Sequence, residues 1–179
     1  MTDLLFEKFP KISRLKRDCI ITEKIDGTNA QILIGIGGTS ILTGSRNRWV
    51  TPQNDNYGFA RWVEENKEEL LLLGPGRHFG EWWGAGIQRR YGLEEKRFSL
   101  FNTSRHKKYL PSCVSLVPEL YRGPFSDGVV DMCLSRLRNE GSVAAPGFMK
   151  PEGVVVFLPA GNHLFKVTLD GDGHKGVNT

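Results

Sequence analysis

Short apolar segments, separated by glycine-rich or polar turns, are the feature that most restricts the fold of this 179-residue chain. Segments of this length that partly alternate with polar residues are typical of β-strands. Gly37-Gly38 separates two of them, which predicts a two-residue hairpin turn. The strands that we expect are residues 19–24, 30–36, 39–42, 77–83, 96–101, 113–117, 153–158 and 163–169.

Two longer segments have helical spacing. Residues 57–73 form the first, which ends at Gly74-Pro75-Gly76, and Ser126 is the expected N-cap of the second, which ends by Gly141. We therefore predict the α+β class, with antiparallel β-sheets and flanking helices. One domain is expected over residues 1–169, followed by a short flexible tail over 170–179. The apolar residues on the helical faces are Phe59, Trp62, Val63, Leu70 and Leu73 in the first, and Val130, Cys133, Leu134 and Leu137 in the second.

The segment Glu23-Lys24-Ile25-Asp26-Gly27-Thr28-Asn29 places one lysine between two carboxylates, just before a glycine. In isolation, this pattern is more typical of a strand that runs into an Asp-Gly turn with a solvated lysine. A lysine that acts as a nucleophile needs surroundings that favour its neutral amine, such as burial, neighbouring cations or a bound metal. The segment therefore becomes informative only together with the rest of the chain.

Five further motifs follow in a fixed order. They are Ser45-Arg46-Asn47, His78-Phe79-Gly80-Glu81-Trp82, Phe98-Ser99-Leu100-Phe101-Asn102, Pro151-Glu152-Gly153-Val154-Val155-Val156 and Leu164-Phe165-Lys166-Val167. The series resembles that of the covalent nucleotidyltransferase superfamily, which contains ATP-dependent DNA ligases, RNA ligases and messenger-RNA capping enzymes. The first motif is most similar to the RNA ligase 2-like branch. The resemblance runs from about Phe6 to Lys166 and implies an ATP-grasp-like ligase adenylation domain.

The resemblance also implies a reaction in three steps. Lys24 attacks the α-phosphorus of ATP and keeps AMP, a nucleic-acid 5′-phosphate takes the AMP, and a 3′-hydroxyl then displaces it. Catalytic roles are implied for Lys24, Asp26, Glu152 and Lys166. Glu152 is further implied as the residue that associates with Mg²⁺ or Mn²⁺, cations that suit hard oxygen ligands.

Nucleotide contacts follow from the same resemblance. Glu23 is expected to accept a hydrogen bond from the adenine amino group, and Glu81 to contact the ribose. Arg46, or Arg48 two residues on, would hold a ribose or phosphate oxygen, and Phe101, or its competitor Phe98, would stack on adenine. Thr168 stands where many relatives have a second lysine, and Lys175 is a candidate substitute. The expected nucleotide-binding set is Glu23, Lys24, Gly27, Asn29, Arg46, Arg48, Glu81, Phe98, Phe101 and Lys166.

A net charge of +4 and a pI near 9.0 favour an anionic partner. Basic clusters are often plain solvated surface, but here each lies next to a motif, the first just before the lysine motif and the others after later motifs, which favours a phosphate-backbone track. The expected partner is a nucleic acid with 5′-phosphate and 3′-hydroxyl ends, RNA being favoured, and one of Trp82 and Trp83 is expected to be exposed for base stacking. The clusters are Arg14, Lys16 and Arg17, then Arg89 and Arg90, then Arg105, His106, Lys107 and Lys108.

Three cysteines without a Cys-x-x-Cys pair indicate neither a disulfide framework nor a structural zinc site, and the sequence has no signal-peptide or membrane-length apolar run, which favours a cytoplasmic location with no membrane association. We also expect a monomer. We expect no OB-fold or other C-terminal domain. A protein partner could then help to bind the nucleic acid. The alternatives are a DNA nick ligase, an adenylation-limited or capping-type nucleotidyltransferase, and a non-catalytic RNA-binding module.

Overall fold

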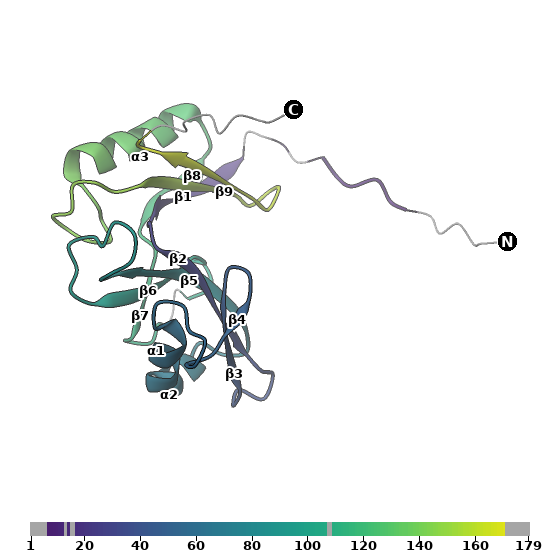
Figure 1. Ribbon diagram of the computed structural model, residues 1–179. Helices are drawn as coiled ribbons and strands as arrows, with labels where there is room; N and C mark the ends of the chain where they lie inside the picture. Colours follow the sequence, from purple (N-terminus) through teal and green to yellow (C-terminus); the bar gives the residue numbers. More distant parts are fainter. Residues whose placement is uncertain (1–6, 13, 15–16, 107–108, 171–179) are drawn as a thin grey trace, which may run out of the picture.

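Two β-sheets form the framework of the computed structural model, which describes residues 7–12, 14, 17–106 and 109–170 (Figure 1). The four-stranded sheet has the order β10-β9-β1-β8, and the six-stranded sheet has the order β4-β3-β2-β5-β6-β7. Neighbouring strands are antiparallel except β6 and β7, which are parallel. The strands are β1 (Asp18–Lys24), β2 (Thr28–Ile34), β3 (Ile41–Ser45), β4 (Trp49–Val50), β5 (Gly76–Gly84), β6 (Lys96–Leu100), β7 (Val114–Leu116), β8 (Glu119–Pro124), β9 (Gly153–Leu158) and β10 (His163–Thr168).

Each sheet has its own hydrophobic core. Helix α3 (Asp127–Glu140) covers one face of the four-stranded sheet, and α1 (Phe59–Glu65) and α2 (Lys67–Leu71) pack with the six-stranded sheet (Figure 1). The apolar side chains of these strands and helices account for both cores, because alternate strand residues point to the same face. A third, smaller cluster lies where the sheets meet and contains Ile25, Trp83, Tyr91, Val117 and Ala145.

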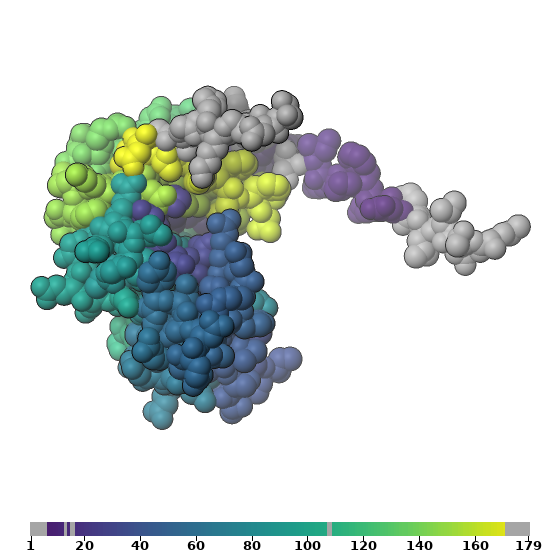
Figure 2. All heavy atoms as spheres, in the orientation of Figure 1, coloured from purple at the N-terminus to yellow at the C-terminus, as the bar shows by residue number. Residues whose placement is uncertain are grey.

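The chain passes from one sheet to the other through residues 25–27, between β1 and β2. Figure 2 shows these early, purple residues at the boundary between the blue part of the molecule and the green-to-yellow part. Gly27 is required at this passage, since a Cβ atom on it would lie 2.4 Å from the carbonyl oxygen of Trp82 and 2.7 Å from the Cβ of Trp83. The predicted lysine motif therefore forms the junction of the fold.

The α+β class with antiparallel sheets is confirmed. The second predicted helix is α3, whose N-cap Ser126 accepts a hydrogen bond from the backbone of Val129. The single helix expected over residues 57–73 is wrong, because Asn66 breaks it into α1 and α2. The backbone of Asn66 departs from helical angles, with φ −110° and ψ 17°, although both its amide and its side chain donate to the carbonyl of Trp62.

The two-residue hairpin turn at Gly37-Gly38 is also wrong. Ile34 pairs with Ile41, so the loop spans residues 35–40 and is closed by a hydrogen bond from the amide of Gly35 to the carbonyl of Ser40. Strands β4 and β8 were not expected, because β4 is only two residues long and β8 has few apolar residues. Among the described helices, none combines the length and the apolar character needed to cross a bilayer.

The close packing at residue 27 yields a testable prediction. Gly27→Ala should lower the free energy of unfolding by about 1–3 kcal/mol, because backbone atoms of Trp82 block the added methyl group. Denaturant unfolding of the purified protein measures this effect. Gly37→Ala is the matched control, since its Cβ would meet only the hydroxyl of Thr39, at 3.8 Å. Equal stability of the two variants would contradict the packing argument.

Candidate active site

Lys24 ends β1, and its ammonium nitrogen lies 2.5 Å from Oε2 of Glu152, 128 residues further along the chain. The contact follows from strand pairing, since Lys24 lies opposite Gly153, the first residue of β9. Both side chains remain partly exposed, at 24% and 16%. Two residues that the sequence assigns to catalysis therefore meet at a position that solvent can reach.

Lys166 and Thr168 lie on the same face of the four-stranded sheet as Lys24. Gly153 pairs with Lys24 on one side and with Thr168 on the other. Lys166 pairs with Val155, two residues further along β9, and therefore points to the same face. Residues opposite one another in antiparallel strands point to the same face, and this face is the one that α3 does not cover. A Cβ atom on Gly153 would lie 2.2 Å from the carbonyl oxygen of Val167, so this glycine lets β9 and β10 pack closely beside Lys24.

Glu81 fixes the start of β2 against β5. Its carboxylate accepts hydrogen bonds from the amide of Gly27, at 3.0 Å, and from Nδ2 of Asn29, also at 3.0 Å. Burial raises the pKa of Glu81 to about 7, although the Gly27 amide, the positive charge of Lys24 and the Asn29 amide all act to lower it. Glu81 thus links the six-stranded sheet to the lysine motif.

Asp26 is held by two residues that the sequence did not single out for it. Arg89 Nε donates to Asp26 at 3.0 Å, and the amide of Asp26 donates to the hydroxyl of Tyr91 at 2.8 Å. Arg89 also donates to the carbonyl of Lys150 and to Asp170. Nothing in the sequence distinguishes Arg89 from Arg90. Its cluster was expected to contact phosphate, whereas the structure uses Arg89 to neutralise two carboxylates.

The loop that carries Arg89 and Tyr91 has an unusual backbone. Three of its non-glycine residues, Gln88, Arg90 and Tyr91, have positive φ angles between 43° and 59°. Such conformations are costly and persist where surrounding contacts hold them. Here the ring of Tyr91 is buried against Trp83 and Phe148 while its hydroxyl accepts the amide of Asp26. The loop is therefore held against the lysine motif.

Glu23 does not reach the open face. Its side chain is buried and accepts hydrogen bonds from the hydroxyl of Ser142, at 2.5 Å, and from the amides of Val143 and Ala144, at 2.8 and 2.9 Å. Burial raises the pKa of Glu23, and these hydrogen bonds partly offset that effect. The expected adenine contact of Glu23 is therefore not supported. Consecutive strand residues point to opposite faces, which separates Glu23 from Lys24.

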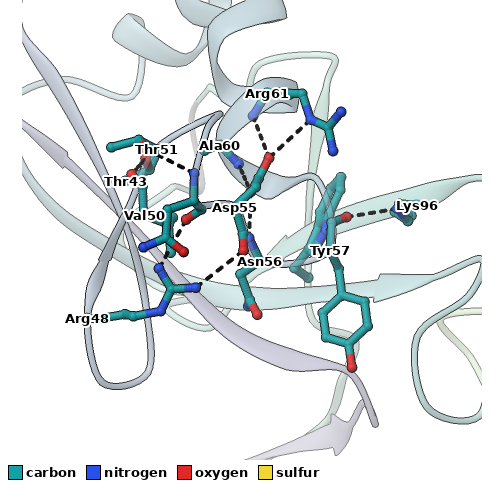
Figure 3. Close-up of polar contacts among 12 residues, drawn as sticks. Thr43, Arg48, Val50, Thr51, Asp55, Asn56, Tyr57, Ala60, Arg61 and Lys96 are labelled. Carbon is teal, nitrogen blue, oxygen red and sulfur yellow. Dashed lines mark hydrogen bonds and ion pairs between the residues drawn. The ribbon is translucent and has the colours of Figure 1, made fainter.

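The structure separates the two candidate arginines. Arg48 donates to the carbonyls of Asn54, at 3.0 Å, and Asp55, at 3.3 Å, and so braces the loop before α1 (Figure 3). Arg46 is exposed, and its guanidinium makes no hydrogen bond or ion pair with any described residue. The last β2–β3 pair is Ala30 with Ser45, so Arg46 follows at the end of the sheet where Asn29 lies. Arg46 is the better candidate for a nucleotide contact.

The two candidate phenylalanines also differ. Phe98 is fully buried in the core of the six-stranded sheet, with its ring centroid 5.1 Å from that of Phe59. Phe101 follows β6, is 41% exposed, and donates its amide to the carbonyl of Phe79. The adenine contact expected of Phe98 is thus excluded by burial, whereas Phe101 remains available for it.

Three further expectations about surface residues need correction. Trp82 and Trp83 are both buried, because Trp82 packs in the sheet core and Trp83 in the cluster between the sheets. His106 is buried, and the guanidinium of Arg105 donates to the carbonyls of Pro75 and Arg77. Asp170, assigned to the tail, is held by Arg89. Lys16, Lys107, Lys108, Lys175 and residues 171–179 lie outside the described residues.

A cavity of about 580 Å³ lies elsewhere, between β6, β7 and Val143–Ala144. It is lined by neither Lys24 nor Glu152 nor Lys166. We place the candidate site at Lys24 and Glu152, which contact each other, because the lysine and the carboxylate that line the cavity do not pair: Lys96 donates to the carbonyl of Tyr57, and Glu95 is paired with Arg97.

Comparison with known proteins shows the family and the fold. A family model described as RNA ligase matches residues 17–168. A search of curated proteins finds no match. Solved structures of an RNA ligase from Naegleria gruberi are similar in fold: a mutant with AMP and Mn at TM-score 0.64 and 21% identity, and another with ATP and Mn at 0.60 and 19%. Each alignment covers 86% of this chain and 50% of that chain, so this chain spans about half the length of the ligase chains that it matches.

The raised pKa of Glu81 predicts a pH dependence of stability. Below about pH 4.5 the carboxyl is neutral in both folded and unfolded chains, so its contribution to stability is fully present. As the pH rises to about 7, the unfolded chain ionises first and that contribution is lost. Compared with Glu81→Gln, the wild-type protein should lose roughly 2–3 kcal/mol of unfolding free energy over this window.

Denaturant unfolding of both proteins at a series of pH values measures the difference. Other titrating groups, such as the buried His78 and His106, are common to both proteins and cancel in the comparison. Stability curves that run parallel from pH 4.5 to 8 would show that Glu81 does not titrate as expected.

Proposed function

Because this chain belongs to the RNA ligase family, we propose that it is an ATP-dependent RNA ligase that joins a 5′-phosphate to a 3′-hydroxyl through AMP carried on Lys24. The observation that carries the proposal is the contact between Lys24 and Glu152 at 2.5 Å. It places a lysine and a carboxylate, each from a separate motif, at an accessible point between two sheets. This contact distinguishes Lys24 from a lysine in a solvated turn, which would contact only water.

Lys24 is the proposed nucleophile. Attack requires a free lone pair on Nζ, so Lys24 must first give up a proton and its hydrogen bond to Glu152. Glu152 is positioned to receive that proton. The nitrogen then bonds to the α-phosphorus of ATP, the bond from phosphorus to the bridging oxygen breaks, and pyrophosphate leaves. AMP remains on Lys24 until a 5′-phosphate oxygen attacks the same phosphorus and the phosphorus–nitrogen bond to Lys24 breaks. The 3′-hydroxyl oxygen then loses its proton and attacks the phosphorus of the 5′-phosphate, and AMP leaves.

The residues at the site fit Mg²⁺ or Mn²⁺. No group of three or more potential metal-ligating side chains occurs among the residues that the structure describes, and Glu152 is the carboxylate next to Lys24. Mg²⁺ commonly binds through one or two carboxylates, several waters and substrate phosphates, so Glu152 would hold the ion. When bound, such an ion neutralises negative charge on phosphate oxygens.

Other side chains on the open faces are proposed to position the nucleotide. Lys166 shares the sheet face of Lys24 and would neutralise charge on the α-phosphate. Arg46 would contact a phosphate or ribose oxygen, and Phe101 would stack on adenine. Glu81 retains lone pairs beyond the two hydrogen bonds that it accepts, so it would accept a further hydrogen bond from a ribose hydroxyl.

Adduct formation tests the nucleophile directly. The purified chain, incubated with α-labelled ATP and Mg²⁺ or Mn²⁺, should acquire acid-labile label that survives denaturing electrophoresis. Lys24→Arg should form no adduct, because it keeps a positive charge beside Glu152 but lacks the amine. Lys67→Ala, which changes an exposed lysine on α2, should be labelled like the wild type.

The joining step needs a second readout. Adding RNA with 5′-phosphate and 3′-hydroxyl ends should discharge the label and yield a longer strand. Label on Lys24→Arg would refute the nucleophile assignment, and label from α-labelled GTP alone would point to a capping-type reaction. A chain with no label from either nucleotide would contradict the proposal.

Arg46 and Arg48 should respond differently to substitution. Arg48→Ala should lower the melting temperature, because three carbonyl oxygens of the loop lose a donor. Arg46→Ala should leave the melting temperature unchanged and weaken ATP binding. Thermal unfolding and titration with ATP measure the two effects. Unchanged ATP binding in Arg46→Ala would remove this residue from the proposed site.

A further inference from the structure

One face of the six-stranded sheet carries large apolar side chains in contact with solvent. It is the face opposite α1 and α2, and strand register places Gln31, Arg77 and Glu81 on it. The exposed fractions are 54% for Leu42, 49% for Trp49, 52% for Phe79 and 41% for Phe101. Solvated faces of antiparallel sheets are usually polar, and a continuous exposed apolar patch commonly marks an interaction site.

Arg77 organises this face. Its guanidinium carbon lies 5.4 Å from the ring centroid of Trp49 and 5.8 Å from that of Phe79, so the cation is placed against two aromatic rings. Gln31 accepts a hydrogen bond from Arg77 and donates from its amide nitrogen to the carbonyl of Ser45. The rings and the cation are therefore held in place before any ligand arrives, which lowers the entropy lost on binding.

The charges on this face favour a negatively charged partner. Among the residues that register places there, Glu81 is the only carboxylate, and it is buried and hydrogen-bonded. Exposed aromatic rings next to a fixed arginine suit a ligand with flat apolar groups and negative charge. A nucleic-acid strand has both features, because its bases stack on aromatic rings and its phosphates attract arginine.

We propose that Trp49, Arg77 and Phe79 form a stacking platform for unpaired bases of the RNA strand that is being joined. This inference rests on the proposed function, since it takes RNA as the substrate. Phe79 lies two residues from Glu81 on β5, a distance of about 7 Å along the strand. An RNA end at Lys24 would thus reach the platform within a few nucleotides. Bases inside a duplex are already stacked and paired, so the platform favours single-stranded ends.

RNA binding by the full chain tests the platform. The probes are a labelled 5′-phosphorylated single strand of about 12 nucleotides, a length within the range that stacking sites cover, and a blunt duplex of the same sequence. Fluorescence anisotropy at fixed salt gives the dissociation constants. Trp49→Ala and Phe79→Ala should each weaken single-strand binding about 5- to 50-fold and change duplex binding much less. Phe79→Tyr should retain wild-type affinity because it keeps the ring.

Three controls separate stacking from misfolding, from ionic contacts and from loss of adduct formation. Phe165→Ala removes an equally exposed strand aromatic, 53% accessible, from the other sheet and should bind like the wild type. The slope of affinity against salt should be unchanged in Phe79→Ala, because the lost contact is not ionic. Formation of the AMP adduct from ATP should also be unchanged in both alanine variants.

The outcomes are distinguishable. Normal adduct formation together with unchanged single-strand binding in both alanine variants would overturn this inference alone and leave the face to a protein partner. Equal losses for the single strand and the duplex, or no binding of the single strand by the wild-type chain, would overturn it as well. A wild-type chain that forms no AMP adduct would instead contradict the proposed function.

Discussion

The passage of residues 25–27 between the two sheets is the constraint on which the site depends. Gly27 touches the backbone of Trp82, and its amide is bound by Glu81, so β1 and β2 have fixed positions relative to each other. Lys24 is the last residue of β1 before this passage. The position of Lys24 therefore depends on both sheets. The pairing of β1 with β9 brings Glu152 next to it, and the hydrogen bond from Gly27 to Glu81 connects it to the six-stranded sheet.

The carboxylates of the motifs divide into two groups with different surroundings. Glu23, Asp26 and Glu81 each bind a separate part of the chain, namely the loop at 142–145, Arg89 and the start of β2. Glu152 is bound to Lys24 and remains accessible. The carboxylates of the first group connect separate parts of the chain at the junction, whereas Glu152 contacts the proposed nucleophile. Accessibility does not separate the groups, since the side chain of Asp26 is 28% exposed and that of Glu152 is 16% exposed. The same residue type thus serves structure and the proposed reaction at neighbouring positions.

Local sequence signals predicted several strands and helix α3. Features that depend on side-chain orientation or on loop conformation could not be predicted in this way. Strand 153–158 and the capped helix α3 follow from apolar spacing and from Ser126, which are local signals. Choosing Phe101 over Phe98, or Arg46 over Arg48, requires knowing which way a side chain points, and strand register decides that. The role of Arg89 depends on a loop with three positive φ angles, which no composition predicts. The break at Asn66 lies in its non-helical backbone angles, φ −110° and ψ 17°, which the apolar spacing of residues 57–73 does not reveal.

The order of strands has a consequence for synthesis on the ribosome. Strands β2 to β7 lie consecutively in the chain and make the six-stranded sheet among themselves, whereas β1 has only β8 and β9 as neighbours. Those partners are translated roughly a hundred or more residues after β1, and long-range pairing of this kind forms late because loop closure costs entropy. A nascent chain can therefore complete one half of the molecule while Lys24 has no partner. The proposed site around Lys24 is therefore completed only after β8 and β9 have been made.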